Sequence, residues 1–140
     1  AKIYQYVGDE VVMSWSYSDA NQQKNASIST FYDYQATLQQ KNEMYIRRFG
    51  IAPEFRGSID VGPVTIIEVG DVKREIVYHG DVLNTASRLL DICKDRNNHL
   101  VVNTEVVNIN LGGFNQIWNE SIQLRGKQEQ VDVVGLEFAE

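Results

Sequence analysis

The chain has 140 residues, a length that suits one domain with its own core. With 43% hydrophobic residues, 23% charged residues and only short apolar runs, it has the composition of a soluble globular protein, with no membrane-spanning segment. A net charge of -6 argues against sequence-independent nucleic-acid binding, which requires a basic surface. The single cysteine excludes an internal disulfide and is typical of a reducing cytoplasm, the expected location. Zinc-ligand spacings and a P-loop motif are both absent from the sequence.

The first half of the chain predicts two hairpins with a helix between them. Alternating residues predict strands over 2–7 and 11–15, joined by a turn at Gly8-Asp9. The polar residues 19–25 predict a loop, and helical spacing from Ser27, a candidate N-cap, predicts one helix that Gly50 ends. The stretch "FRGSIDVGPVTIIEVG" then predicts one long strand with a bend at Gly62-Pro63. The turn "VGDVK" leads into the strand "REIVY" and completes the second hairpin.

The second half predicts a helix followed by short strands. The helical pattern covers residues 81–94, and Asp81 stands where an N-cap residue is expected. The stretches "HLVVNTEVV", "FNQIWNE", "IQLRG" and "QVDVVGLEF" predict short strands, with one helical turn near Thr104. This order of elements favours an α+β fold, in which helices pack on one face of a mixed or antiparallel sheet.

The helix within "HGDVLNTASRLLDICKD" has two different faces. At 100° per residue, one face is apolar and carries Val82, Ala86, Leu89 and Cys93. The opposite face carries Asn84, Arg88, Asp91 and Asp95. Asn84 and Arg88 project together near the helix start, where free N–H groups favour an anion. The alternative is a solvated polar face on which Arg88 pairs with Asp91 or Asp95.

Asp9 in the hairpin "YVGDEVV" also has two interpretations. Gly-Asp is common in tight turns for reasons of backbone conformation alone. An aspartate at a hairpin turn is equally able to hold a metal ion through its carboxylate. The hairpin by itself does not decide between these interpretations.

Four blocks of the sequence, taken together, resemble the catalytic domain of class III nucleotide cyclases, with bacterial adenylate cyclases the nearest pattern. In chain order they are "QYVGDEVVMSW", "FRGSIDVGPV", "IVYHGDVLNTASRLLD" and "IQLRGKQEQVDVVGLE". The resemblance covers nearly all of the chain, 1–140, as one domain, and implies a ferredoxin-like or palm-type sandwich. It also implies a phosphorus–oxygen lyase, in which the ribose 3′-hydroxyl of a nucleoside triphosphate attacks the α-phosphate and pyrophosphate leaves.

The resemblance assigns roles to five residues. Two Mg²⁺ or Mn²⁺ ions held by two aspartates are implied, and Asp9 matches one of these ligands. Asn84 matches the asparagine that orients the ribose, and Arg88 the arginine that stabilises charge on the α-phosphate. Arg125 matches the basic residue at the terminal phosphates, with Lys127 as its substitute. A head-to-tail homodimer with the sites at its interface is implied as well.

The chain departs from the family pattern at its start. The first metal aspartate of the family lies on a strand before the Gly8-Asp9 hairpin, and no such strand precedes residue 2 in the sequence. We therefore expect a fragment that lacks the first strand and first helices and is inactive by itself. A longer parent chain, free to carry membrane segments upstream, is expected to catalyse the reaction.

The two positions that read the base in the family are Gln5 and Val77, and they match neither the adenine-selective nor the guanine-selective pair. ATP is the default substrate from the overall resemblance, and GTP stays open. Gln5 can donate to and accept from either purine, whereas Val77 offers only packing. The alternative is that both are ordinary strand residues. His79, next to Gly80, is either a nucleotide contact or a turn histidine without a role.

Two other functions compete with the enzyme. A cyclase-like domain without catalysis would serve as a nucleotide sensor or dimerisation module, which the unusual Gln5 and Val77 favour. The acidic hairpin is also typical of diguanylate cyclases and polymerase palms, but the Asn84/Arg88 helix does not belong to that pattern.

Overall fold

The computed structural model describes residues 2–16, 20–73, 75–107, 113–124 and 129–139, with 20–25 described by their backbone alone. The elements in chain order are β1 (Lys2–Val7), β2 (Glu10–Ser14), α1 (Ala20–Gln40), α2 (Asn42–Phe49), β3 (Gly57–Ile59), β4 (Thr65–Val69), β5 (Glu75–His79), α3 (Asp81–Asp95), β6 (Leu100–Asn103), a 3₁₀ turn (Thr104–Val106), β7 (Phe114–Gln123) and β8 (Gln130–Phe138). No helix among these is long and apolar enough to cross a membrane.

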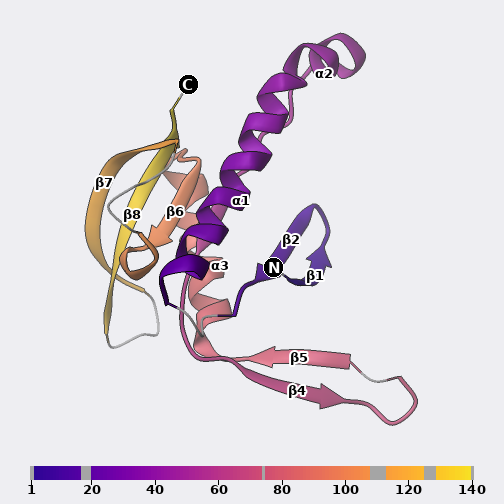
Figure 1. Ribbon diagram of the computed structural model, residues 1–140, viewed down its shortest axis with the longest axis vertical. Coiled ribbons are helices and arrows are strands. Elements are labelled where there is room, and N and C mark those ends of the chain that lie inside the picture. The colour runs from indigo at the N-terminus through magenta and orange to yellow at the C-terminus, as the bar shows by residue number, and fades with distance from the viewer. Residues whose placement is uncertain (1, 17–19, 74, 108–112, 125–128, 140) are drawn as a thin grey trace.

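A four-stranded mixed sheet in the order β3-β6-β8-β7 carries the buried core and lies to the left of α1 in Figure 1. β3 runs parallel to β6, and the other neighbouring strands are antiparallel. The α+β fold class with a mixed sheet is therefore confirmed.

Helices cover both faces of this sheet, whereas the sequence predicted them on one face only. On one face, Ile28 of α1 packs in a cluster with Leu100 and Leu136. On the other, Leu89 and Cys93 of α3 pack against Val101. The reason is the run of apolar residues in β6, which is buried on both sides of the strand and needs a cover on each.

Two hairpins lie outside the four-stranded sheet (Figure 1). β1 pairs with β2 through a turn in which Gly8 has a φ of 60°, a conformation that favours glycine. β4 pairs with β5, and we call this hairpin the arm because it projects from the molecule with every residue of β4 exposed. Both predicted hairpins are confirmed.

Several predicted boundaries are wrong. The predicted strand over 55–70 divides at the Gly62-Pro63 bend into β3 and β4, which belong to different sheets. Residues 20–25 begin a helix instead of a loop, and the predicted helix over 27–49 divides into α1 and α2 at Lys41. Gly50 does end α2, with a φ of 78° and a backbone N–H that donates to Ile46 O at 2.9 Å. The two strands predicted near 114–126 form one strand, β7.

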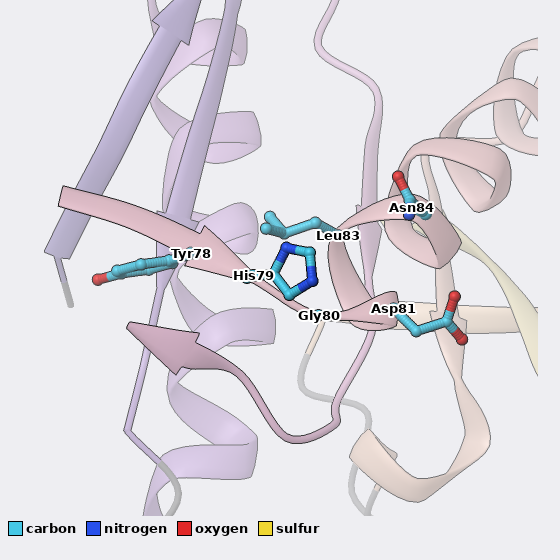
Figure 2. Close-up of a pocket in the computed structure, with 6 residues that line it drawn as sticks. All are labelled: Tyr78, His79, Gly80, Asp81, Leu83 and Asn84. Carbon is cyan, nitrogen blue, oxygen red and sulfur yellow. The ribbon is translucent and has the colours of Figure 1, made fainter. Parts of the chain in front are cut away.

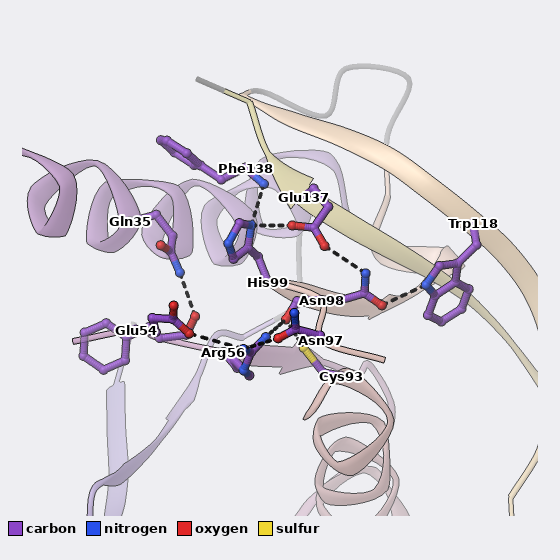
Figure 3. A network of polar contacts seen from close by, with 11 residues as sticks. Gln35, Glu54, Arg56, Cys93, Asn97, Asn98, His99, Trp118, Glu137 and Phe138 are labelled. Atoms are coloured by element: carbon purple, nitrogen blue, oxygen red, sulfur yellow. Dashed lines mark hydrogen bonds and ion pairs between the residues drawn. The ribbon is translucent and has the colours of Figure 1, made fainter. Parts of the chain in front are cut away.

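A polar network joins the end of α3 to β7, to β8 and to the segment before β3 (Figure 3). Asn98 is its centre: its side-chain Oδ1 accepts from Trp118 Nε1 at 2.8 Å, and its Nδ2 donates to Glu137 Oε1 at 3.0 Å. The Asn98 carbonyl accepts from Arg56 Nη1 at 2.7 Å and from Cys93 Sγ at 3.1 Å. The position of α3 against the sheet is thereby set at its C-terminal end.

Candidate functional site

The site begins where β5 passes directly into α3. His79 is the last residue of β5, Gly80 holds the N-cap position, and the helix starts at Asp81. Asp81 is therefore the first helical residue and not the N-cap that the sequence predicted. Glycine is required here because a Cβ at Gly80 would lie 2.7 Å from Pro63 O, which is too close. The chain can approach the Pro63 backbone only without a side chain at this position.

An open pocket of about 360 Å³ lies at this junction (Figure 2). Its lining residues are Tyr78, His79, Gly80, Asp81, Leu83 and Asn84. His79 and Leu83 occupy the middle of the view in Figure 2, whereas the Tyr78 ring points away from His79. The structure thus brings the predicted ribose residue Asn84 together with His79, for which the sequence left two interpretations open.

Arg88 lies one helical turn after Asn84, is half-buried and does not line the pocket. The exposure of Asn84, Asp91 and Asp95 confirms the predicted polar face. On the apolar face, Leu89 and Cys93 are fully buried.

Thr85, which the sequence analysis did not place in the core, is also buried in the apolar face of α3, and its hydroxyl has no partner in the described structure. Burial also raises the pKa of the Cys93 thiol to about 11, which keeps it protonated and inert.

A pair of stacked tyrosines joins the first hairpin to the root of the arm. The rings of Tyr4 and Tyr78 lie 4.2 Å apart and nearly parallel. The backbone N–H of Tyr78 donates to Tyr4 Oη at 3.2 Å, and the Tyr78 hydroxyl lies 3.3 Å from Ser14 Oγ. The register of β1 shifts between Ile3 and Gln5, so that Tyr4 stands at a bulge, a device that redirects side chains. Sequence reasoning missed this contact because nothing in the sequence indicates which tyrosines meet.

The two predicted base-reading positions flank this stack. Gln5 follows Tyr4 and is exposed, while Val77 precedes Tyr78 and is half-buried. Neither lines the pocket at the start of α3. The tyrosine stack therefore brings the two chain segments that carry these positions together, outside the pocket itself.

Asp9 is exposed at the turn between β1 and β2 and is not a pocket residue. Arg125 and Lys127 lie outside the described residues. Magnesium at nucleotide sites is commonly held by one or two carboxylates together with phosphate oxygens, and Asp9 fits the role of one such carboxylate. Within the described ranges, no group of three His, Cys, Asp or Glu residues stands ready to hold a metal by protein groups alone.

The chain has relatives among known nucleotide cyclases, although no family model matches it. It is 28% identical over 102 residues to Adenylate cyclase 2 of Rhizobium meliloti (strain 1021), which is 73% of this chain but only 28% of the relative. The structure of the guanylyl cyclase Cya2 superposes with a TM-score of 0.73 at 15% identity, over 99% of this chain and 71% of that one. A bacterial light-regulated adenylyl cyclase superposes with a TM-score of 0.69 at 20% identity, over 95% of this chain and 38% of that one. The similarity predicted from the four sequence blocks is confirmed, and the fold of this chain is that of a class III nucleotide cyclase catalytic domain.

Proposed function

We propose that residues 1–140 belong to one nucleotide cyclase catalytic domain, which converts a purine nucleoside triphosphate into its 3′,5′-cyclic nucleotide and pyrophosphate. The observation that carries the proposal is the junction of β5 and α3, where Asn84 lines a pocket and Arg88 follows one turn later on the same helix. The sequence similarity to an adenylate cyclase and the cyclase fold support the same conclusion.

Asn84 and Arg88 perform different tasks in this proposal. The exposed Asn84 amide hydrogen-bonds the ribose and orients its 3′-hydroxyl toward the α-phosphate. Arg88, partly desolvated, stabilises the negative charge that develops on the α-phosphate as the bond to pyrophosphate breaks. Arg125 and Lys127 bind the terminal phosphates.

Asp9 is proposed as one carboxylate ligand of a magnesium or manganese ion. Such an ion, when bound, would neutralise phosphate charge and lower the pKa of the attacking hydroxyl. The second carboxylate that the resemblance implies is not assigned to any residue of this chain.

ATP is the proposed substrate and GTP the alternative. The relatives include proteins named as adenylate and as guanylyl cyclases, so the comparisons do not choose between the two. Gln5 is the proposed polar contact to the purine, because its amide both donates and accepts.

A homodimer is proposed because the chain does not gather its site residues in one pocket. Asp9 lies on the first hairpin, apart from the pocket of Asn84. The arm also exposes Ile66 to 65% and Ile76 to 63%, and apolar side chains at that exposure favour burial against a partner. A second copy of this chain would complete the site and cover the arm.

The decisive experiment measures cyclic nucleotide formation by the longest chain that contains residues 1–140. ATP and GTP are supplied in turn with Mg²⁺ or Mn²⁺, and the product is quantified by chromatography. We expect cyclic AMP as the main product, and at most trace product from residues 1–140 alone. A folded dimer of the longest chain that forms no cyclic product with either metal would overturn the proposal.

A second candidate function is a nucleotide-sensing or dimerisation module without catalysis. The lack of a hydrogen-bonding group at Val77 favours it. Nucleotide binding by the longest chain without any cyclic product would establish this function in place of the enzyme.

A further inference from the structure

His79 lies on the face of β5 that the base-reading position shares. Side chains two residues apart point to the same side of a strand, so Glu75, Val77 and His79 form one row. Across the arm, His79 pairs with Thr65 and Val77 pairs with Ile67, which keeps the register of this face regular. His79 is the member of the row next to α3, and it lines the pocket together with Asn84.

The His79 imidazole is available for a ligand. Its side chain is exposed, and within the described part of the chain it has no hydrogen-bond or ion-pair partner. His99, the only other histidine, is committed to the fold, because its Nδ1 accepts the Phe138 N–H at 2.9 Å. The two histidines therefore have different roles, and His79 is the one that lines the pocket at the start of α3.

His79 supplies the hydrogen-bonding side chain that Val77, its neighbour in the row, lacks. The Val77 side chain is apolar, and so is the side chain of Leu83, which lines the pocket together with His79. A neutral imidazole carries one donor and one acceptor nitrogen as well as a flat ring. Adenine and guanine differ in the donors and acceptors on their edges, so a side chain of this kind can distinguish them.

We propose that His79 contacts the purine base of the bound nucleotide and is a determinant of base specificity, in place of the hydrogen bond that Val77 cannot make. The inference rests on the proposed cyclase function and adds a residue to it. In this arrangement the base lies along the row of Val77 and His79, and the ribose lies at Asn84. The Leu83 side chain packs against the base or the ribose from the helix side.

The first test observes both histidines by NMR during a nucleotide titration. The protein carries ¹³C-labelled histidine, and His79→Gln assigns the two imidazole signals. The α,β-methylene analogues of ATP and GTP are used with Mg²⁺, since they cannot be cyclised. We expect the His79 signals to move saturably with the preferred analogue, while the His99 signals stay in place.

The second test measures base discrimination in variants. His79→Ala should raise the dissociation constant of the preferred analogue about ten-fold and reduce the preference between the two bases, as expected for one lost hydrogen bond. Glu75→Gln, in the same row but away from the pocket, is the matched control and should leave both constants unchanged. Because both side chains are exposed, the variants should unfold at the temperature of the unaltered chain.

The outcomes separate this inference from the proposed function. Saturable binding with stationary His79 signals, or an unchanged preference in His79→Ala, would overturn the role of His79 and leave the cyclase proposal standing. If neither analogue binds to the longest chain that contains residues 1–140, both the role of His79 and the proposed function are overturned.

Discussion

At the scale of single residues, the partial burial of Arg88 determines how its function can be tested. A guanidinium that is partly removed from water interacts more strongly with a developing charge than one on an open surface. Arg88 and Asn84 lie one turn apart on α3. In the proposed function, Asn84 orients the substrate and Arg88 stabilises the developing charge. Their replacement should affect different kinetic parameters.

Replacement of Arg88 by alanine should reduce kcat by roughly 10² to 10³, the usual effect of removing one preorganised donor from a developing oxyanion. The Michaelis constant should change much less, because the interaction is strongest in the transition state. Steady-state kinetics of the longest active chain measure both constants. If only the Michaelis constant rises, Arg88 binds the ground state and its assigned role is wrong.

Gln5 offers a test of substrate choice on the first hairpin. Gln5→Lys places an ammonium donor at the position where adenine-selective relatives are expected to carry lysine, and should raise the ratio of ATP to GTP turnover. Gln5 is exposed, so the change should not disturb folding. An unchanged ratio in the two-substrate assay would remove Gln5 from base recognition.

The single cysteine predicts a chemical difference between the folded and unfolded chain. Burial raises the Cys93 pKa from 9.0 to about 11, so the thiol is protonated to higher pH in the folded state. At pH 8 the two-unit shift lowers the thiolate fraction about 100-fold, and alkylation by iodoacetamide should slow at least as much. Mass spectrometry of native and urea-unfolded protein measures both rates.

The same shift has a consequence for stability. Because the folded pKa is the higher one, the contribution of the Cys93 thiol to stability is complete below pH 9.0 and is lost as the pH rises through about 11.

In the alkylation experiment, equally fast reaction of folded and unfolded chains would show that Cys93 is accessible, contrary to its burial.

At the scale of elements, the end of α3 depends on the Asn98 network. Asn98 is 4% exposed and satisfies polar groups from β7 and β8 as well as from the segment before β3. The helix that carries Asn84 and Arg88 is therefore held at its C-terminal end, far from the pocket at its start. A buried amide of this kind is costly to remove because its partners lose their hydrogen bonds.

Asn98→Ala should lower the free energy of unfolding by about 2 kcal/mol, because Trp118 Nε1 and Glu137 each lose a buried partner. Urea denaturation monitored by tryptophan fluorescence provides the measurement. Asn115→Ala, at an exposed position of β7, is the control and should change stability by less than about 0.5 kcal/mol. Equal effects of the two substitutions would contradict the role given to the network.

Local patterns in the sequence predicted individual helices and strands well. They predicted less well how these elements pair and pack. The helix after Gly80 was found because its apolar residues recur with helical spacing, and Gly50 was found because only glycine readily adopts the conformation that ends α2. The division of residues 55–70 into β3 and β4 was not found, because pairing with β6 or β5 is decided by distant segments. The same reason hid the contact between Tyr4 and Tyr78, which are 74 positions apart.

The residues of the candidate site also differ in how far the sequence alone could predict them. Helical spacing places Asn84 and Arg88 on one face of α3, but their roles were predicted from the resemblance of the four sequence blocks to a known family. The sequence left His79 as either a nucleotide contact or a turn histidine without a role, and the pocket that it shares with Asn84 favours the first interpretation. A residue at the end of a strand gains its function from what the next element brings near, and that information is not local.

At the scale of the whole molecule, the arm presents more apolar surface than its own two strands can bury. An isolated two-stranded hairpin is marginally stable in water, and β4 has no buried residue. Val72 at the arm's turn is completely exposed. These features agree with the proposed homodimer, in which a second copy covers the arm.

Ile76→Lys should therefore weaken self-association, because it places a charge on the exposed face of the arm. Ile76 is 63% exposed, so the monomer should lose little stability. Ile117→Lys is the matched control, because Ile117 on β7 is 55% exposed but lies outside the arm. Sedimentation velocity over a range of concentrations should show a lower dimer fraction only for Ile76→Lys, and an equal fraction in both variants would exclude the arm as the interface.

The close approach of Gly80 to Pro63 brings the two ends of the arm together beside the pocket that Gly80 lines. Pro63 comes just before β4, and Gly80 comes just after β5, so neither strand can tilt without displacing this contact. A nucleotide bound in the pocket would hold the segment at Gly80, and a partner bound to the arm would hold both of its strands. Both would then favour the same arrangement of the segments at Pro63 and Gly80. Such coupling is reciprocal: whatever assembly adds to nucleotide affinity, the nucleotide adds to assembly.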